Sequence, residues 1–265
     1  MDLQLNGKKA LVSGSTAGIG LAIATVLARE GASVVIAGRS REKLQKARES
    51  IRSSLNKGGD VIAVATDLAV ADGVKTIIDS VPDVDILVNN LGIYETKSFF
   101  ELQDSDWARL FEINVMSGVR LARHYLRGML VRNFGRIMFI SSESGIMIPP
   151  EMIHYGFTKS AQLAVARGLA ELTKGTNVTV NSVLPGPTMS DGIVDFLRSM
   201  SSKADPTPEE AEKEFFDKHR SSSLLQRLID PHEIANLAAF IASPLSSATN
   251  GAALRAEGGL VRTIY

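Results

Sequence analysis

Tyr155 and Lys159 are spaced for proton transfer. If segment 153–174 is helical, residues four positions apart share one face, which places the lysine ammonium beside the phenol. A free phenol has a pKa of about 10 and exchanges protons poorly at neutral pH, whereas a neighbouring cation lowers that pKa. Many helices carry this spacing by chance, so the alternative is a half-buried tyrosine beside a lysine. Motifs elsewhere in the chain are needed to distinguish a proton-transfer pair from a chance spacing.

A glycine-rich turn at residues 14–20 has the composition of a phosphate-binding loop. The apolar segment 9–13 precedes it, and segment 21–30, with helical spacing, follows it. In a strand–turn–helix unit, bare backbone amides and the positive helix end face the anion, and the missing side chains allow close approach. The pattern is Gly-x-x-x-Gly-x-Gly, and the alternative is a turn that merely requires glycine. We expect dinucleotide binding here, with the glycines being Gly14, Gly18 and Gly20.

Arg39 follows the second apolar segment, 33–37. The end of the second strand is where such folds contact the adenosine ribose: an acidic residue binds a 2′-hydroxyl, and an arginine accommodates a 2′-phosphate. Because the acidic residue is absent and Arg39 is present, the sequence favours NADP(H) over NAD(H). The alternative is a solvated arginine in a loop.

Apolar and amphipathic segments alternate along the chain. This pattern predicts a Rossmann-type α/β fold, a doubly wound parallel sheet with helices on both faces. Polar and glycine-rich residues follow the strands, at the edge where open α/β sheets bind ligands. Strands are expected at 9–13, 33–37, 61–65, 84–88, 136–140, 178–183 and 251–256, and helices at 21–30, 40–55, 70–80, 104–132, 153–174 and 230–242.

The composition limits the classes of function. The 265 residues include 29 basic and 29 acidic side chains, so no overall field would attract nucleic acid or an anionic membrane. The absence of cysteine excludes disulfides and thiolate metal sites, and the four histidines are scattered. No apolar run is long enough to span a bilayer, and the first residues are too polar for a signal peptide. We expect a soluble cytoplasmic protein without a metal.

The chain shows no linker, so we expect one domain over residues 1–265. Segment 189–223 is its irregular part, with a helix-like piece at 208–219. Its mixture of apolar and charged residues suits a lid over a substrate pocket, although a surface excursion is the alternative. Several apolar residues in or near the lid are candidates for contact with a medium-sized apolar ketone or β-keto ester: Met147, Ile148, Met152, Met189, Phe196 and Met200.

These motifs, in this order and spacing, resemble the classical short-chain dehydrogenase/reductase family across nearly the whole chain. The segments 185–188 and 251–259 are similar to those of reductases of the 3-oxoacyl-[acyl-carrier-protein] type. The matching pieces are Ser13-Gly14-x-x-x-Gly18-Ile19-Gly20, Asp67-Leu68, Asn89-Asn90-x-Gly92, Asn114, Ser142, Tyr155-x-x-x-Lys159 and Pro185-Gly186.

The resemblance implies an NAD(P)(H)-dependent oxidoreductase that interconverts a ketone and a secondary alcohol. Tyr155 would be the general acid or base, and Lys159 would lower its pKa and bind the nicotinamide ribose. Ser142 would polarise the substrate oxygen, and Asn114 would position a water. Contacts to the dinucleotide would come from Gly14, Ser15, Thr16 and Ile19 at the pyrophosphate, Asp67 and Leu68 at the adenine, Asn89 and Gly92 along the ribose, and Pro185, Gly186 and Thr188 beside the nicotinamide amide.

Two residues depart from the family pattern. Leu91 replaces the usual alanine and could crowd the adenosine ribose. Ala17 replaces a basic residue that many NADP-binding members carry, so a 2′-phosphate would depend on Arg39.

Two other functions fit the motifs. One is a 3-oxoacyl-thioester reductase of fatty-acid synthesis, although the mixed charges of segment 189–223 do not indicate a docking patch for an acidic carrier. The other is a dinucleotide sensor without catalysis, which the intact set of Asn114, Ser142, Tyr155 and Lys159 disfavours. The resemblance also implies a homotetramer that assembles through segments 104–132 and 153–174.

Overall fold

The computed structural model describes residues 1–55, 60–190 and 192–264. Within them, seven parallel strands form one sheet in the order β3-β2-β1-β4-β5-β6-β7, which confirms the doubly wound fold. The strand order reverses between β1 and β4, and in open α/β sheets this switch point is where ligands bind. The strands are β1 (Lys9–Ser13), β2 (Ser33–Gly38), β3 (Val61–Ala65), β4 (Ile86–Asn89), β5 (Gly135–Ile140), β6 (Val178–Pro185) and β7 (Ala253–Ala256).

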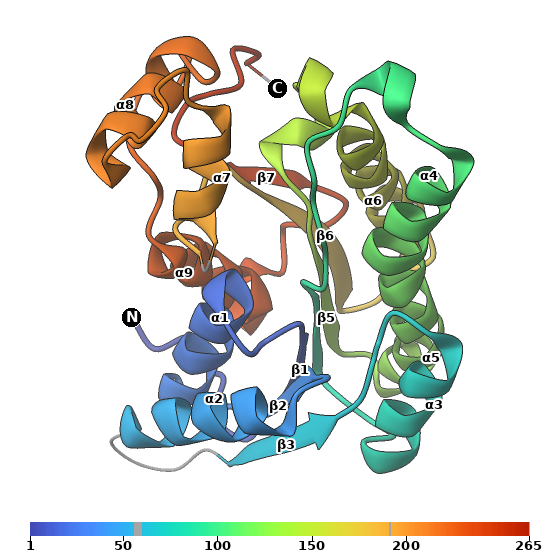
Figure 1. Cartoon of the computed structure of the whole chain (residues 1–265). Coiled ribbons are helices and arrows are strands. Elements are labelled where there is room, and N and C mark those ends of the chain that lie inside the picture. The colour runs from blue at the N-terminus through green and yellow to red at the C-terminus, as the bar shows by residue number, and fades with distance from the viewer. Residues whose placement is uncertain (56–59, 191, 265) are drawn as a thin grey trace.

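Helices cover both faces of the sheet, as Figure 1 shows. Successive residues of a strand point to opposite faces. Val12 of β1 accordingly packs into one apolar core and Leu11 into the other. The first core includes α1 (Gly18–Arg29), α2 (Arg41–Ser53) and α9 (Pro231–Ala242); the second includes α3 (Ala71–Ser80), α5 (Ser117–Arg132) and α6 (Ile153–Glu171). Burial on both faces explains why these strands read as continuous apolar runs.

The segment expected as one helix over 104–132 is divided. A wide π-turn, Glu112–Met116, separates α4 (Asp104–Phe111) from α5. π-Turns inside helices often occur at functional sites. This one contains Asn114, whose side-chain Oδ1 accepts from the backbone N–H of Ile93 at 2.8 Å and whose Nδ2 donates to the Ile93 carbonyl at 2.9 Å. The turn therefore fixes the loop after β4 against the helices.

The segment expected as a lid, 189–223, contains two helices, α7 (Ile193–Met200) and α8 (Pro208–Lys218); residue 191 lies outside the described residues. They pack together through an apolar cluster of their own that includes Leu197, Phe215 and Phe216. A capping box of Thr207 and Glu210 starts α8. Short 3₁₀ turns occur at Phe99–Glu101, Glu143–Gly145, Pro150–Met152 and Pro244–Ser246. Across the part of the chain that the structure describes, every helix is too short or too polar to span a bilayer.

Candidate active site

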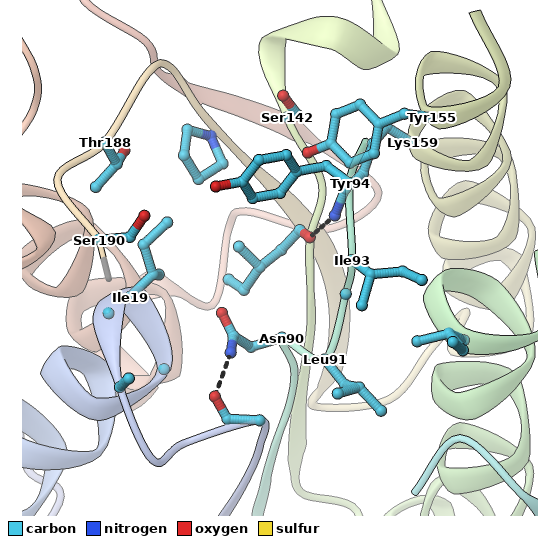
Figure 2. Close-up of a pocket in the computed structure, with 18 of the residues that line it drawn as sticks. Ile19, Asn90, Leu91, Ile93, Tyr94, Ser142, Tyr155, Lys159, Thr188 and Ser190 are labelled. Atoms are coloured by element: carbon cyan, nitrogen blue, oxygen red, sulfur yellow. Dashed lines mark hydrogen bonds between the residues drawn. The ribbon is translucent and has the colours of Figure 1, made fainter. Parts of the chain in front are cut away.

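A cavity of about 530 Å³ lies at the carboxyl ends of the strands. Figure 2 shows side chains from the loop after β4, from α6 and from the loop after β6 converging on it. Its walls contain most of the residues that the sequence singled out: Gly14, Thr16, Gly18, Ile19, Gly20, Arg39, Asp67, Leu68, Gly92, Ser142, Tyr155, Lys159, Pro185, Gly186 and Thr188. Ser15, Asn89 and Asn114 are not part of its lining.

The glycine-rich turn leaves the amino end of α1 open. Gly14 and Gly18 have positive φ values of 62° and 54°, a region that favours glycine. Asn90 braces the turn, since its Nδ2 donates to the carbonyls of Ser13 and Gly14 at 3.0 Å each. No side chain caps the first amides of α1, and its first turn carries no acidic residue. Uncapped amides at a positive helix end bind phosphate, so this part of the cavity fits a dinucleotide pyrophosphate.

Three predicted residues support the cavity from behind. Ser15 is fully buried; its hydroxyl donates to the Val12 carbonyl at 2.7 Å and accepts from the Ala37 amide at 3.0 Å, which ties β1 to β2. The side chain of Asn89 is buried and has no hydrogen-bond partner among the described residues. Asn114 Nδ2 also donates to Thr158 Oγ1 at 3.0 Å, so Asn114 joins the β4 loop to α6.

Lys159 is held beside Tyr155 from the buried side of the site. Its Nζ donates to the Ile140 carbonyl at 2.9 Å, as the dashed line in Figure 2 shows, and lies 5.6 Å from the centroid of the Tyr155 ring. The side chain is 5% exposed. Burial lowers the pKa of Lys159 to about 8, although the negative charge of Glu143 acts in the opposite direction. The ammonium is therefore charged at neutral pH and loses its proton only slightly above it.

Tyr155 is kept as a neutral phenol. Burial raises its pKa well above the ordinary value, and the charge of Glu143 raises it further, while a hydrogen bond with Ser142 opposes the shift. The neighbouring Lys159 was expected to lower this pKa instead. In this structure the desolvation of the phenol is the larger effect, so Tyr155 is suited to donate a proton at neutral pH.

A buried carboxylate lies beside Ser142. Glu143 is 5% exposed and lines the cavity. It accepts hydrogen bonds from the hydroxyls of Ser142 and, at 3.1 Å, Ser144. Arg220, which follows α8, lines the same cavity and places its Nε 3.5 Å from Glu143 Oε1. Glu143 was not among the predicted site residues, although an acidic residue directly after Ser142 at the strand end was a signal in the sequence.

An aromatic wall forms the other side of this end of the cavity. The ring centroid of Tyr94 lies 6.2 Å from that of Tyr155 and 5.7 Å from that of Phe196 on α7. Phe215 of α8 lies next to Phe196, at 6.0 Å. Of the six apolar residues expected to meet substrate, only Met152 and Phe196 line the cavity. No group of three or more metal-ligating side chains occurs in the described residues.

The sequence of residues 8–199 matches the short chain dehydrogenase family. The chain belongs to this family. The uncharacterized oxidoreductase YvaG of Bacillus subtilis is 49% identical to it over 100% of both chains. The 3-oxoacyl-[acyl-carrier-protein] reductase FabG of Vibrio cholerae is 32% identical over 97% of this chain and 99% of its own. L-Sorbose reductase from Gluconobacter frateurii, solved with NADPH and L-sorbose, has a TM-score of 0.93 and 30% identity over 100% of both chains.

These similarities confirm the resemblance that the motifs suggested, including its 3-oxoacyl reductase-like branch. The protein is therefore an oxidoreductase of the short-chain dehydrogenase family that acts on CH–OH or C=O groups.

Proposed function

We propose that the protein reduces a ketone to a secondary alcohol with NADPH, and catalyses the reverse reaction with NADP⁺. The observation that carries the proposal is a single cavity that holds both an uncapped phosphate-binding turn and the Ser142, Tyr155 and Lys159 side chains. The solved L-sorbose reductase, which is similar over its whole length, contains NADPH.

Each polar residue has a distinct part in this reaction. A nicotinamide bound here would supply a hydride to the carbonyl carbon, or would accept one from the alcohol carbon. Tyr155, a neutral phenol in this site, donates the proton that the carbonyl oxygen needs as its charge develops. Ser142 donates a hydrogen bond to the same oxygen. Lys159 holds positive charge behind the phenol, and its backbone partner Ile140 fixes its direction.

The preference for NADPH depends on Arg39. This exposed arginine lines the cavity directly after β2, beside Gly38, where the 2′-position of the adenosine ribose would lie. A guanidinium binds a phosphate in two-point geometry. Ala17 offers no second cation, so Arg39 would carry the preference alone.

The deciding experiment is turnover of a panel of ketones with NADPH and with NADH, compared between the wild type and Tyr155→Phe. Loss of the phenol proton is expected to reduce turnover by roughly 10²- to 10⁴-fold. NADPH binding, measured by fluorescence titration, should be unchanged. Unchanged binding would show that the variant is folded. Equal turnover by the variant would contradict the role of Tyr155, and NADPH binding without turnover by the wild type would favour a dinucleotide sensor.

A 3-oxoacyl-thioester reductase is the second candidate, because several relatives at 31–32% identity carry that activity in their names. The panel should therefore include a 3-oxoacyl thioester of a small thiol. A preference for that thioester over every simple ketone would favour this candidate.

The family resemblance also leads us to propose a homotetramer built through segments 104–132 and 153–174, and a single domain whose segment 189–223 closes over the substrate. Phe196, Phe215 and Arg220 of that segment already line the cavity. Light scattering after size-exclusion chromatography tests the tetramer. Slower proteolysis within 189–223 when NADPH and substrate are bound tests the closure.

A further inference from the structure

The substrate end of the cavity contains a buried pair of opposite charges, Glu143 and Arg220. Their side chains are 6% and 7% exposed, and both line the cavity. Glu143 follows Ser142 directly at the end of β5, whereas Arg220 comes from the end of the lid segment. Burying two charges is costly unless their hydrogen bonds are satisfied.

This pair is incompletely satisfied. Arg220 Nε lies 3.5 Å from Glu143 Oε1, and among the described residues it has no hydrogen-bond partner. Its Nη1 is engaged elsewhere, with the His219 carbonyl at 2.8 Å and Glu151 at 3.5 Å. A buried N–H without an acceptor is destabilising, so the site favours a ligand that supplies an acceptor.

The charges around Arg220 and Glu143 indicate which kind of ligand group would bind there. Two carboxylates, Glu143 and Glu151, face one guanidinium, Arg220. An anionic group would meet Arg220 at the expense of repulsion from both carboxylates, and a purely apolar group would leave Arg220 Nε without an acceptor. A hydroxyl suits both charges, since it can accept from Arg220 Nε and donate to Glu143.

The position of Ser142 defines where the hydroxyl would sit. The Ser142 hydroxyl, which would hold the reacting carbonyl oxygen, donates directly to Glu143. The two binding positions are therefore one hydrogen bond apart, which fits two oxygens on neighbouring carbons of the substrate. A substrate hydroxyl that donates to Glu143 would also take the place of Ser142 there, and would free the Ser142 proton for the carbonyl oxygen.

We propose that Glu143 and Arg220 recognise a hydroxyl on the carbon next to the carbonyl, so that the substrate is a neutral α-hydroxy ketone and the product a vicinal diol. The inference rests on the proposed function. The carbonyl carbon gains a hydride from NADPH, the C=O π bond breaks, Tyr155 protonates the oxygen, and NADPH becomes NADP⁺. The neighbouring hydroxyl is bound and does not react.

The test compares three probes with NADPH: 3-hydroxy-2-butanone, 2-butanone and pyruvate. The measured quantity is the ratio of kcat/KM for the hydroxy ketone to that for 2-butanone, because effects on proton transfer cancel in it. We expect the wild-type ratio to exceed about 10 and to fall by roughly 10- to 100-fold in Glu143→Gln and in Arg220→Met, the usual range for a hydrogen bond to a charged group. Glu209→Gln, an exposed charge change on the same lid segment, should keep the wild-type ratio.

Each outcome is decisive. A wild type that reduces 2-butanone as well as the hydroxy ketone, or variants with unchanged ratios, would overturn the inference and leave the proposed function intact. A preference for pyruvate would also overturn it, since Arg220 would then bind an anion. Reduction of no carbonyl at all would overturn the proposed function and the inference together. If Glu143→Gln does not fold, the Arg220→Met ratio alone decides.

Discussion

Gly20 should be the least replaceable residue of the phosphate-binding turn, and Gly20→Ala tests this. Gly20 lies in the first turn of α1, where alanine normally stabilises a helix by about 1 kcal/mol relative to glycine. A Cβ at this position would lie 2.4 Å from Asn90 Nδ2 and 2.4 Å from the Gly14 carbonyl oxygen. These two atoms are hydrogen-bonded to each other, so the methyl group would push apart the contact that braces the turn.

The expected cost follows from these contacts. Overpacking costs about 1–3 kcal/mol. The loss of the Asn90 hydrogen bonds to Ser13 and Gly14 costs about 1 kcal/mol each, and the gain in helix propensity offsets about 1 kcal/mol. The net destabilisation is about 2–4 kcal/mol, which corresponds to a fall in Tm of roughly 4–16 °C for a chain of this size. NADPH binding should weaken as well, because the displaced amides are those that face the pyrophosphate.

Thermal unfolding followed by circular dichroism, and NADPH titration by fluorescence, measure both effects. Gly168→Ala on α6 is the matched control, because a Cβ there meets no atom within 4 Å. Gly168→Ala should raise Tm slightly and leave the affinity for NADPH unchanged. Size-exclusion chromatography would check that the oligomer size of this variant is also unchanged. If Gly20→Ala were as stable as the wild type and bound NADPH equally well, the close approach of Asn90 and Gly14 would not be what holds this turn.

Two further predictions concern the cations of the site. Arg39→Ala should raise the KM for NADPH by roughly 10- to 100-fold and leave the KM for NADH unchanged, and an equal effect on both cofactors would contradict recognition of the 2′-phosphate. Since the pKa of Lys159 is lowered to about 8 while the Tyr155 phenol stays neutral, reductive kcat should fall as pH rises through about 8. In Lys159→Arg, whose guanidinium keeps its charge, the residual activity should lack this fall, as a pH–rate profile would show.

The sequence was sufficient to predict the arrangement of the fold. Strand β1 is apolar at every interior position because both of its faces are buried, and this run followed by glycines is a strong local signal. Local rules also placed the start of α9, where Asp230 caps the helix and Pro231 occupies its first turn. The carboxyl ends of parallel strands share one edge, so the polar residues after β1, β2, β4 and β5 were expected to meet, and they line one cavity.

Features that depend on distant contacts could not be predicted. The π-turn between α4 and α5 has no local breaker; it is held by the bonds of Asn114 to Ile93 and Thr158. Arg220 was visible only as one charge among many in the lid segment, since 77 positions separate it from Glu143. Only the three-dimensional fold brings these two residues to the same cavity.

Burial of the phenol outweighs the lowering of the Tyr155 pKa expected from Lys159, and the negative charge of Glu143 adds to the effect of burial. A lysine lowers the pKa of a phenol when its charge is close to it and uncompensated. Here Lys159 donates to the Ile140 carbonyl. The negative charge of Glu143 acts to raise the pKa of both Tyr155 and Lys159. Such a site holds its proton on Tyr155, which is the state required to reduce a carbonyl. Oxidation of an alcohol needs the phenolate as the base, so we expect it to require a higher pH than reduction.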